Sequence, residues 1–414
     1  MSSLLVTDIK GLTGTHSPNV LVLRGTDLSD LPTVSDAWLL IEHGLIKDFG
    51  RMTDLATHNL KLTTQISVKG KYILPAWCDS HTHLVFPASR EEEFVMRIKG
   101  RSYEEIAKAD GGILNSARKL QSATEDELFE NAFYRLDQVI KLGTGAIEVK
   151  SGYGLDYESE LKMLRVIRRL KETVPIPIKA TFLGAHAYPE RFKSDHESYL
   201  KILINEILPQ IADEKLADYI DVFCERGFFS LDETSRILEA GAKYGLKGKV
   251  HANQLSATGA VEMAVKHHAL SVDHLEMMNN DALQSLKNHD TIATLLPACS
   301  LFLDISFANA RSLIDHNIAV AIASDFNPGS APSGNMNLVV SLACMRLKML
   351  PEEAINAATI NGAAAMELSQ NYGSISRGKA ANFIVTKEIS SLAYLPYSFG
   401  SNLIESVFIN GKIY

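Results

Sequence analysis

The sequence predicts an α/β protein, a (β/α)8 barrel of the TIM type that carries a small β-sandwich domain built from both chain termini. Three observations support this fold. The middle of the chain alternates apolar runs with helical stretches, the two ends are rich in β-formers, and polar side chains follow the apolar runs. A doubly wound sheet is the alternative fold, but no Gly-x-Gly-x-x-Gly motif follows an early strand, so its dinucleotide-binding version has little support.

The two ends of the chain are similar in character. Short strands are expected in both of them, at 19–23, 37–41, 45–50, 382–386 and 406–414. Asn410-Gly411 is a strong hairpin turn within the last of these. Because neither end can bury its own apolar face alone, we expect residues 1–72 and 370–414 to pair into one composite β-sandwich domain.

Residues 73–369 are expected to form the barrel. About eight apolar runs occur over roughly 290 residues, and the segments between them have helical spacing, as at 158–171 and 231–242. The expected barrel strands are 73–79, 144–150, 178–184, 219–224, 248–251, 270–274, 291–296 and 318–324.

The composition excludes several classes of protein. With 46% hydrophobic and 22% charged residues the 414-residue chain is an ordinary globular protein, and its net charge of −8 argues against a nucleic-acid partner. No uninterrupted apolar run reaches the roughly 18 residues that a membrane span needs, and Asp8 comes too early for a secretory signal. The four cysteines are scattered, which suits reduced thiols in a cytoplasmic protein and disfavours a cysteine metal site.

In a (β/α)8 barrel the chemistry gathers at the C-terminal ends of the strands. The polar residues at these expected ends are His81, His83, Glu148, Lys150, His186, Cys224, Glu225, His251, Asp273, His274 and Asp325. Any one of them could be a satisfied core or rim residue. Histidines and an aspartate at the ends of several different strands are harder to explain by packing, because each buried polar group needs a partner.

A metal ion would satisfy these groups. His81 and His83 are two positions apart, so in an extended strand they point the same way. With His251 and Asp325 they offer three nitrogens and one oxygen, a set suited to one zinc or ferrous ion with an open position for water, whose pKa such an ion can lower towards about 7. A second ion is not expected, because the fourth strand ends at residues 223–225 without a lysine.

His274 and Lys150 lie at the ends of two further strands. His274 is placed to take a proton or to polarise a substrate carbonyl; the alternative is a hydrogen bond that supports a metal ligand. For Lys150 we expect a structural ion pair, with Glu148 as the partner.

Five motifs carry a family resemblance. They are Asp-Ser-His-Thr-His (79–83), Glu-Val-Lys-Ser-Gly-Tyr-Gly-Leu (148–155), Phe-Leu-Gly-Ala-His-Ala-Tyr-Pro (182–189), His-Ala-Asn-Gln-Leu (251–255) and Ser-Asp-Phe-Asn-Pro-Gly-Ser (324–330). With them the chain closely resembles, over nearly its whole length, the amidohydrolase superfamily and, within it, the imidazolonepropionase family of histidine breakdown. The resemblance implies metal-dependent hydrolysis of the ring amide of 4-imidazolone-5-propanoate, which gives N-formimidoyl-L-glutamate.

The resemblance also implies site residues. One zinc or iron (Fe2+ or Fe3+) ion is held by His81, His83, His251 and Asp325. Substrate contacts are implied at Arg90, Tyr153, His186, Gln254, Asn327, Gly329 and Ser330. Some relatives carry Glu where this chain has Gln254; a glutamine can orient the ring N–H but cannot accept a full proton, so we assign the general base to His274 with Asp325. Relatives often have an acidic residue at the position of Asn253, which leaves the role of Asn253 open.

The chemistry of an acidic substrate agrees with these assignments. Arg90, in the loop after the first strand, can take a carboxylate bidentately; alternatively it pairs with one of the acidic residues 91–93 on the surface. Tyr103 either assists at the carboxylate or packs in a helix. Glycines on both sides of Tyr153 let its loop approach a ligand closely, or form a simple turn.

Two other functions compete with this one. One is another activity of the superfamily, a nucleobase deaminase or a different cyclic-amide hydrolase, but Arg90 and the Tyr153 loop favour an acidic substrate. The other is a barrel that has lost catalysis and serves as a scaffold, which should lack one or more ligands, and here the whole set is present. We therefore expect a small acidic substrate, no nucleic-acid or membrane partner, and a homodimer.

Overall fold

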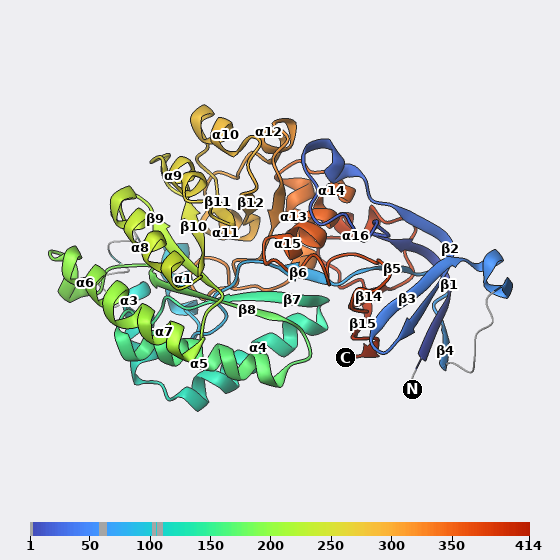
Figure 1. The fold of residues 1–414 in the computed structure, drawn as a ribbon, viewed down its shortest axis with the longest axis horizontal. Helices are drawn as coiled ribbons and strands as arrows, with labels where there is room; N and C mark the ends of the chain where they lie inside the picture. Colours follow the sequence, from blue (N-terminus) through green and yellow to red (C-terminus); the bar gives the residue numbers. More distant parts are fainter. Residues whose placement is uncertain (1–2, 58–63, 102–104, 106–110) are drawn as a thin grey trace.

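The computed structural model describes residues 3–57, 64–101, 105 and 111–414. Two eight-stranded sheets organise them, one parallel throughout and one mixed. Figure 1 shows the two sheets side by side, with most helices around the parallel sheet and both chain ends next to the mixed one. No helix within the described residues is long and apolar enough to cross a membrane.

The parallel sheet follows chain order from β6 to β13. Its strands are β6 (Trp77–Asp79), β7 (Thr144–Lys150), β8 (Ile178–Ala185), β9 (Tyr219–Cys224), β10 (Lys247–Ala252), β11 (Ser271–His274), β12 (Ile292–Leu295) and β13 (Val320–Ile322). Beyond β13 and β6 the chain nearly closes the sheet, since Asp325 N donates to His81 O at 3.0 Å and His83 N donates to Phe326 O at 2.9 Å. The predicted (β/α)8 barrel is confirmed.

Helices cover the outer side of this barrel. They are α1 (Glu91–Ile98), α3 (Ile113–Ser122), α4 (Glu125–Lys141), α5 (Tyr157–Thr173), α6 (His196–Ile202), α7 (Leu208–Glu214), α8 (Leu231–Lys243), α9 (Ala260–Lys266), α10 (Asn280–Leu286), α11 (Pro297–Leu303), α12 (Ala310–Asp315), α13 (Met336–Met345), α14 (Pro351–Ala358), α15 (Ile360–Ala364) and α16 (Tyr394–Tyr397). The two helices predicted at 158–171 and 231–242 are α5 and α8. The largest hydrophobic cluster lies between the barrel strands and these helices.

The mixed sheet joins the two ends of the chain, as predicted. Its strands are β1 (Ser3–Thr13), β2 (Thr33–Glu42), β3 (Leu45–Arg51), β4 (Thr64–Ser67), β5 (Tyr72–Pro75), β14 (Phe383–Thr386), β15 (Ile404–Ile409) and β16 (Lys412–Ile413). Strand β5 pairs with both β1 and β14, and the rings of Phe383 and Phe408 stack 4.5 Å apart in a second core. Asn410 and Gly411 both have positive φ in the turn between β15 and β16. The domain boundaries at 72/73 and 369/370 stay a prediction.

Two strand predictions were wrong. The run 73–79 was predicted as one barrel strand, but it is divided between the sheets, because Ala76 N donates to Asn382 O beside the mixed sheet and Trp77 N donates to Gly143 O beside the barrel. Because the run is apolar and buried in the mixed sheet as well as in the barrel, its residue pattern does not indicate where the chain passes from one sheet to the other. The segment 19–23 is not a strand. Instead of a neighbouring strand, the side chain of Asn361 binds both Leu23 N (2.8 Å) and Leu23 O (2.9 Å).

Candidate active site

A cavity of about 380 Å³ opens where the strands of the barrel end. All seven residues predicted to contact substrate line it, namely Arg90, Tyr153, His186, Gln254, Asn327, Gly329 and Ser330. His83, His251, His274 and Asp325 line it as well. Residues that come from six strand ends and the loops after them therefore share one cavity.

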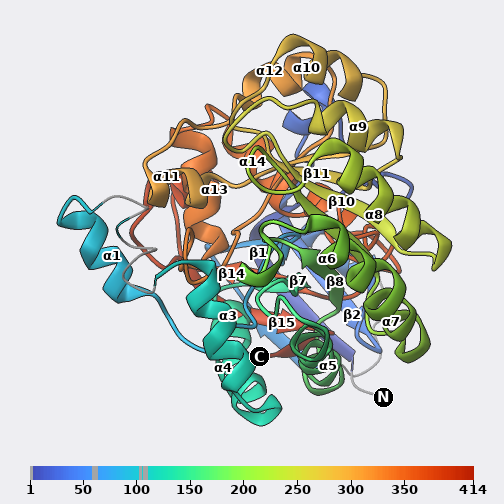
Figure 2. The same ribbon diagram turned by 90° about the vertical axis from the view of Figure 1, so that its left-hand side faces the viewer.

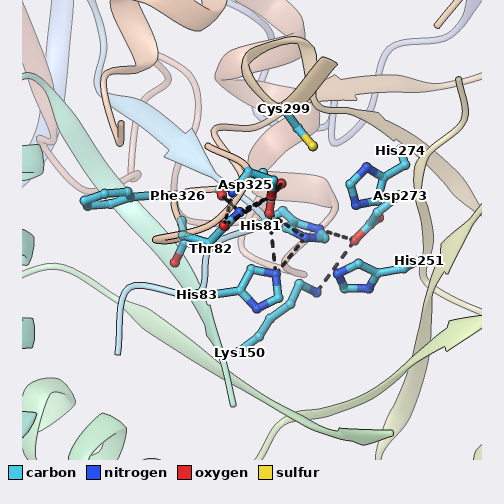
Figure 3. Close-up of polar contacts among 12 residues, drawn as sticks. His81, Thr82, His83, Lys150, His251, Asp273, His274, Cys299, Asp325 and Phe326 are labelled. Carbon is cyan, nitrogen blue, oxygen red and sulfur yellow. Dashed lines mark hydrogen bonds and ion pairs between the residues drawn. The ribbon is translucent and has the colours of Figure 1, made fainter. Parts of the chain in front are cut away.

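Four histidines and one aspartate meet at the floor of this cavity (Figure 3). The Nε2 atoms of His81 and His83 lie 3.2 Å apart, and Oδ1 of Asp325 lies 3.5 Å from each of them. Two groups have ligand atoms within 4.8 Å of one another, His81 with His83 and Asp325, and His81 with His251 and His274. His81 belongs to both groups, so the four predicted ligands and His274 form one cluster around it.

The cluster has the donors that a metal ion requires. Within the described residues, His251 Nε2 is buried and lacks a hydrogen-bond partner. Burial, with Lys150 as a further cause for His81, holds the pKa of both His81 and His83 well below the usual range, so these imidazoles are neutral and keep a lone pair. Neutral imidazole nitrogens and a carboxylate are the ligands that zinc and ferrous iron take in catalytic sites.

A carboxylate stands behind two of the histidines. Nδ1 of His81 lies 2.6 Å from Asp273 Oδ2, and Nδ1 of His251 lies 3.1 Å from Asp221 Oδ1. Because an ionised carboxylate only accepts, each Nδ1 carries the proton and each Nε2 presents its lone pair to the cluster. This is the arrangement that orients a histidine towards a metal ion.

Lys150 interacts with both of these carboxylates, of which Figure 3 labels Asp273. Its Nζ donates to Glu148 Oε1 at 2.6 Å, as predicted, but also to Asp221 Oδ2 at 2.7 Å, and it lies 3.6 Å from Asp273 Oδ2. Lys249 contacts the other oxygen of Glu148, and all five side chains are buried. Lys150 is therefore fixed in an ion network and also supports the histidine partners. Sequence reasoning missed Asp221, although a carboxylate inside the apolar run 219–224 could have indicated it.

The charges around the cluster do not balance. Two buried ammonium groups, those of Lys150 and Lys249, face four buried carboxylates, those of Glu148, Asp221, Asp273 and Asp325. His81 and His83 are neutral because their pKa values are lowered. Against the effect of burial, Glu276 and then Asp325 raise the pKa of His274, and burial raises the pKa of Asp325, so these two groups reduce the excess of negative charge without removing it. Buried charge that lacks a counter-charge is costly, so this excess of negative charge fits a divalent cation.

The backbone is strained at three of the residues that follow or end the barrel strands. Asn253, His274 and Asp325 all have positive φ, at 54°, 86° and 54°. Such residues cost free energy and persist where the surroundings hold them. Nδ2 of Asn253 donates to Met277 O at 3.1 Å, which ties the loop after β10 to the loop after β11. Asn253 therefore has a structural contact.

Arg90 lines the cavity and pairs with Glu93, one of the three acidic residues expected as its partner. Its Nε and Nη2 donate to the two oxygens of Glu93 at 2.9 and 2.5 Å, and the pair lies at the cavity instead of on the surface. A Cβ at position 329 would collide with Arg90 Nη1, so any larger residue there would displace the guanidinium of Arg90. Two further arginines, Arg97 and Arg101, line the same cavity and were not predicted. Arg97, on the helix α1 that lies beside α11 in Figure 2, donates to Gly329 O at 2.9 Å.

The other predicted substrate contacts have partners that set their orientation. Nδ1 of His186 lies 3.0 Å from Gly152 O and so donates to it, and burial, followed by His251, lowers the pKa of His186 to about 3. Nε2 of Gln254 donates to Cys299 Sγ at 3.5 Å, which leaves the amide oxygen of Gln254 for a ligand N–H.

The loop after Asp325 is organised by Asn327. Its Oδ1 accepts from Gly329 N (2.8 Å) and Ser330 N (2.7 Å), and Ser330 Oγ lies 3.4 Å from Asp325 Oδ2. Asn327 therefore shapes the cavity wall beside Asp325. Tyr103 lies outside the described residues.

The fold and a match to a known family define the class of protein. A family model described as "Amidohydrolase family" matches residues 72–414, and the chain belongs to this family of hydrolases. The imidazolonepropionase of Christiangramia forsetii is 55% identical over 411 residues, which cover 99% of this chain and 100% of the relative. That of Flavobacterium johnsoniae is 53% identical over 409 residues, 99% of each chain. Within the amidohydrolases, the chain is a member of the imidazolonepropionase family.

Solved structures share the fold at low identity. The guanine deaminase of E. coli has a TM-score of 0.75 at 14% identity and covers 100% of this chain and 99% of its own. The N-isopropylammelide isopropylaminohydrolase of Burkholderia multivorans has a TM-score of 0.71 at 15% identity, with 100% and 98% covered. At this identity the likeness supports the barrel with its terminal sheet, and the substrate must be argued from closer relatives.

Proposed function

We propose that the protein hydrolyses the ring amide of 4-imidazolone-5-propanoate to N-formimidoyl-L-glutamate, a step of histidine breakdown. The observation that carries this proposal is the full-length identity of 52–55% to curated imidazolonepropionases. The cavity adds support, because all seven predicted substrate contacts line it beside the histidine cluster. In the reaction water adds to the ring carbonyl carbon, the carbon–nitrogen bond breaks, and the departing nitrogen takes a proton.

We propose His81, His83, His251 and Asp325 as the ligands of one divalent ion, zinc or iron. The support is the buried His251 Nε2 without a partner among the described residues, the neutral state of His81 and His83, and the excess of buried carboxylates. When bound, the ion supplies Lewis acidity, which polarises a carbonyl and acidifies water.

The protein's own groups then bind the substrate and move the protons. Arg90 and Tyr153 bind the propanoate carboxylate, and the free amide oxygen of Gln254 accepts from the ring N–H. His274, assigned from the sequence to the general base together with Asp325, here donates to the carbonyl oxygen as negative charge develops on it, which leaves Asp325 as the base. Asp325 takes the proton from water and passes it to the departing nitrogen. His186, neutral at physiological pH, lies beside the ring and orients it.

Two further expectations remain proposals. Four free cysteines, three of them buried, fit a reducing cytoplasm. A homodimer is expected for a barrel of this kind.

The test is turnover by the purified protein after loading with zinc or iron. We expect hydrolysis of imidazolone propionate, with about one metal ion per chain by elemental analysis. Guanine and a hydantoin carboxylate serve as the competing substrates. Turnover of either at a higher kcat/KM than imidazolone propionate, or turnover of none of the three, would overturn the proposed function.

A further inference from the structure

A buried carboxylate outside the cavity holds the loop that carries Tyr153. Glu160 lies in the first turn of α5, and its side chain is fully buried. Its Oε2 accepts from Gly152 N at 3.1 Å, and its Oε1 accepts from Gly154 N at 2.8 Å and Leu155 N at 3.0 Å. One side chain thus satisfies three backbone N–H groups of a four-residue loop.

The loop needs such support because its backbone is strained. The strain lies at Leu155, whose φ of 56° is in a region that a leucine rarely adopts, whereas the φ of 108° at Gly152 suits glycine. A Cβ at position 154 would lie 2.5 Å from Glu160 N, so the loop also packs tightly on the start of α5. Strained segments persist when the surrounding contacts hold them, and here the contacts come from Glu160.

The held loop sets two side chains of the cavity. The ring of Tyr153 lies 6.1 Å from that of His83 and 5.6 Å from that of His186. The carbonyl of Gly152 accepts the Nδ1–H of His186, which fixes the tautomer of that histidine. Glu160 is not among the residues that line the cavity, so any effect it has on substrate passes through this loop.

We propose that Glu160 is a positioning residue, which holds the 152–155 loop so that Tyr153 and His186 meet the substrate. The proposal rests on the proposed function, because it assigns Glu160 a part in binding the same acidic substrate. On this proposal, the substrate contact of Tyr153 depends on Glu160, a helix residue whose side chain accepts hydrogen bonds from the loop backbone.

The variant Glu160→Gln tests it with little change of shape. An amide keeps one acceptor oxygen, but its NH2 group then faces a loop N–H, donor against donor. We expect the KM for imidazolone propionate to rise about tenfold, because hydrogen bonds to a charged group are lost, while kcat changes less and the metal content stays the same. A role through charge alone predicts the opposite sign, since removing a negative charge should help an anionic substrate to bind.

A double-mutant cycle separates positioning from general destabilisation. If Glu160 acts through Tyr153, adding Glu160→Gln to Tyr153→Phe should raise KM by less than about threefold beyond Tyr153→Phe alone. Glu353→Gln is the control, because Glu353 is also buried, accepts from Leu350 N at 2.7 Å and pairs with Arg311, but lies outside the cavity. It should lower the melting temperature and leave KM unchanged. The proposal would be overturned if the rise in KM of the double mutant equalled the product of the rises in the two single mutants. It would also be overturned if Glu353→Gln raised KM as much as Glu160→Gln does.

Hydrogen exchange separates this proposal from the proposed function. If the wild-type protein does not turn over imidazolone propionate, the function fails, and amide exchange still tests whether Glu160 holds the loop. We expect peptides that cover 151–156 to exchange faster in Glu160→Gln than in the wild type or Glu353→Gln. Equal exchange in all three proteins would reject the positioning role.

Discussion

Each histidine of the cluster has a distinct set of contacts. Nδ1 of His81 and Nδ1 of His251 donate to buried carboxylates, which leaves the lone pairs of their Nε2 atoms available to the proposed metal ion. His274 differs, because its Nδ1 lies 3.7 Å from Glu276 Oε1. Burial alone lowers the pKa of His274, but Glu276 and then Asp325 outweigh it and raise the pKa above the ordinary value. His274 is therefore the member of the cluster best suited to carry a proton.

Replacing His274 tests this role. We expect His274→Phe to lower kcat on imidazolone propionate by about 100-fold or more, because phenylalanine fills the space but offers no nitrogen to the reacting carbonyl. The metal content, measured by elemental analysis on the same preparation, should stay near that of the wild type. Full activity, or a loss of metal as large as the loss of turnover, contradicts the prediction.

Lys150 is predicted to control metal affinity without being a ligand. In Lys150→Met the carboxylates of Asp221 and Asp273 lose their cation and hold His251 and His81 less firmly. We expect chelator competition to give a metal affinity about 10–100-fold weaker.

A second buried lysine provides the control. Lys379 donates to Ser369 O at 2.6 Å, away from the cluster. Lys379→Met should reduce stability with unchanged metal affinity. The assignment of Lys150 is wrong if both variants lose affinity equally, or if neither does.

At this scale the sequence predicts ligands better than their supports. His81 and His83 could be predicted because strand alternation puts both on one face, and the ends of later strands supplied His251, His274 and Asp325. Glu160 could not, since its partners are backbone N–H groups of a loop, which spacing does not show. Asp221 stands out as a carboxylate inside an apolar run, but nothing in the spacing shows that its partner is His251 on another strand. The arginines Arg97 and Arg101 lie on and after a helix whose approach to the cavity depends on tertiary packing.

At the scale of elements, helices with regular spacing and strands with sharp ends were predicted closely, as at 144–150 and 219–224. The strand prediction at 19–23 failed because the side chain of Asn361 takes the hydrogen bonds that a neighbouring strand would make. The prediction at 73–79 failed because one apolar run is divided between the two sheets. Contacts between helices were also beyond the sequence. On α5, Arg165 donates through Nε (3.1 Å) and Nη2 (2.6 Å) to both oxygens of Glu214 on α7.

This pair gives a pH-dependent prediction. The bonds from Arg165, then that from Gln210, lower the pKa of Glu214 from 4.5 to about 2. A carboxyl with a lowered pKa stabilises the fold above its unfolded pKa, and the stabilisation is lost as pH falls through the folded value. We expect Glu214→Gln to lower the free energy of unfolding by about 1–2 kcal/mol at pH 7, allowing for partial exposure.

The comparison is urea unfolding of wild type and variant at pH 7 and pH 3. At pH 3 the difference should be less than half its value at pH 7, because the unfolded chain is then already protonated at this position. A difference that is constant with pH would mean that the variant acts through packing alone.

At the scale of the whole molecule, the cluster joins parts of the barrel that the strand ladders leave weakly connected. Strands β6 and β13 have three residues each, and the chain beyond them is joined by the bonds from Asp325 N to His81 O and from His83 N to Phe326 O. The proposed ligands lie on both sides of this seam, with His251 across the barrel at the end of β10. An ion held by these residues would therefore link the first, fifth and last strands in one set of bonds.

Metal removal should consequently loosen the seam as well as stop turnover. Without the ion, the carboxylate excess is unbalanced and His251 Nε2 stays buried without a partner from the described residues. An ion that binds only the folded state stabilises that state by about 4 kcal/mol when its free concentration is 1,000 times its Kd. We therefore expect the chelated protein to melt several degrees lower than the metal-loaded protein. Scanning calorimetry with stepwise addition of zinc should show the melting temperature recovering fully at about one equivalent.

Hydrogen exchange should become faster on chelation in peptides that cover 79–84 and 323–328, and should change little in the mixed sheet. Recovery that needs two equivalents would contradict a single-ion site, and an unchanged melting temperature would mean that the seam does not depend on the ion.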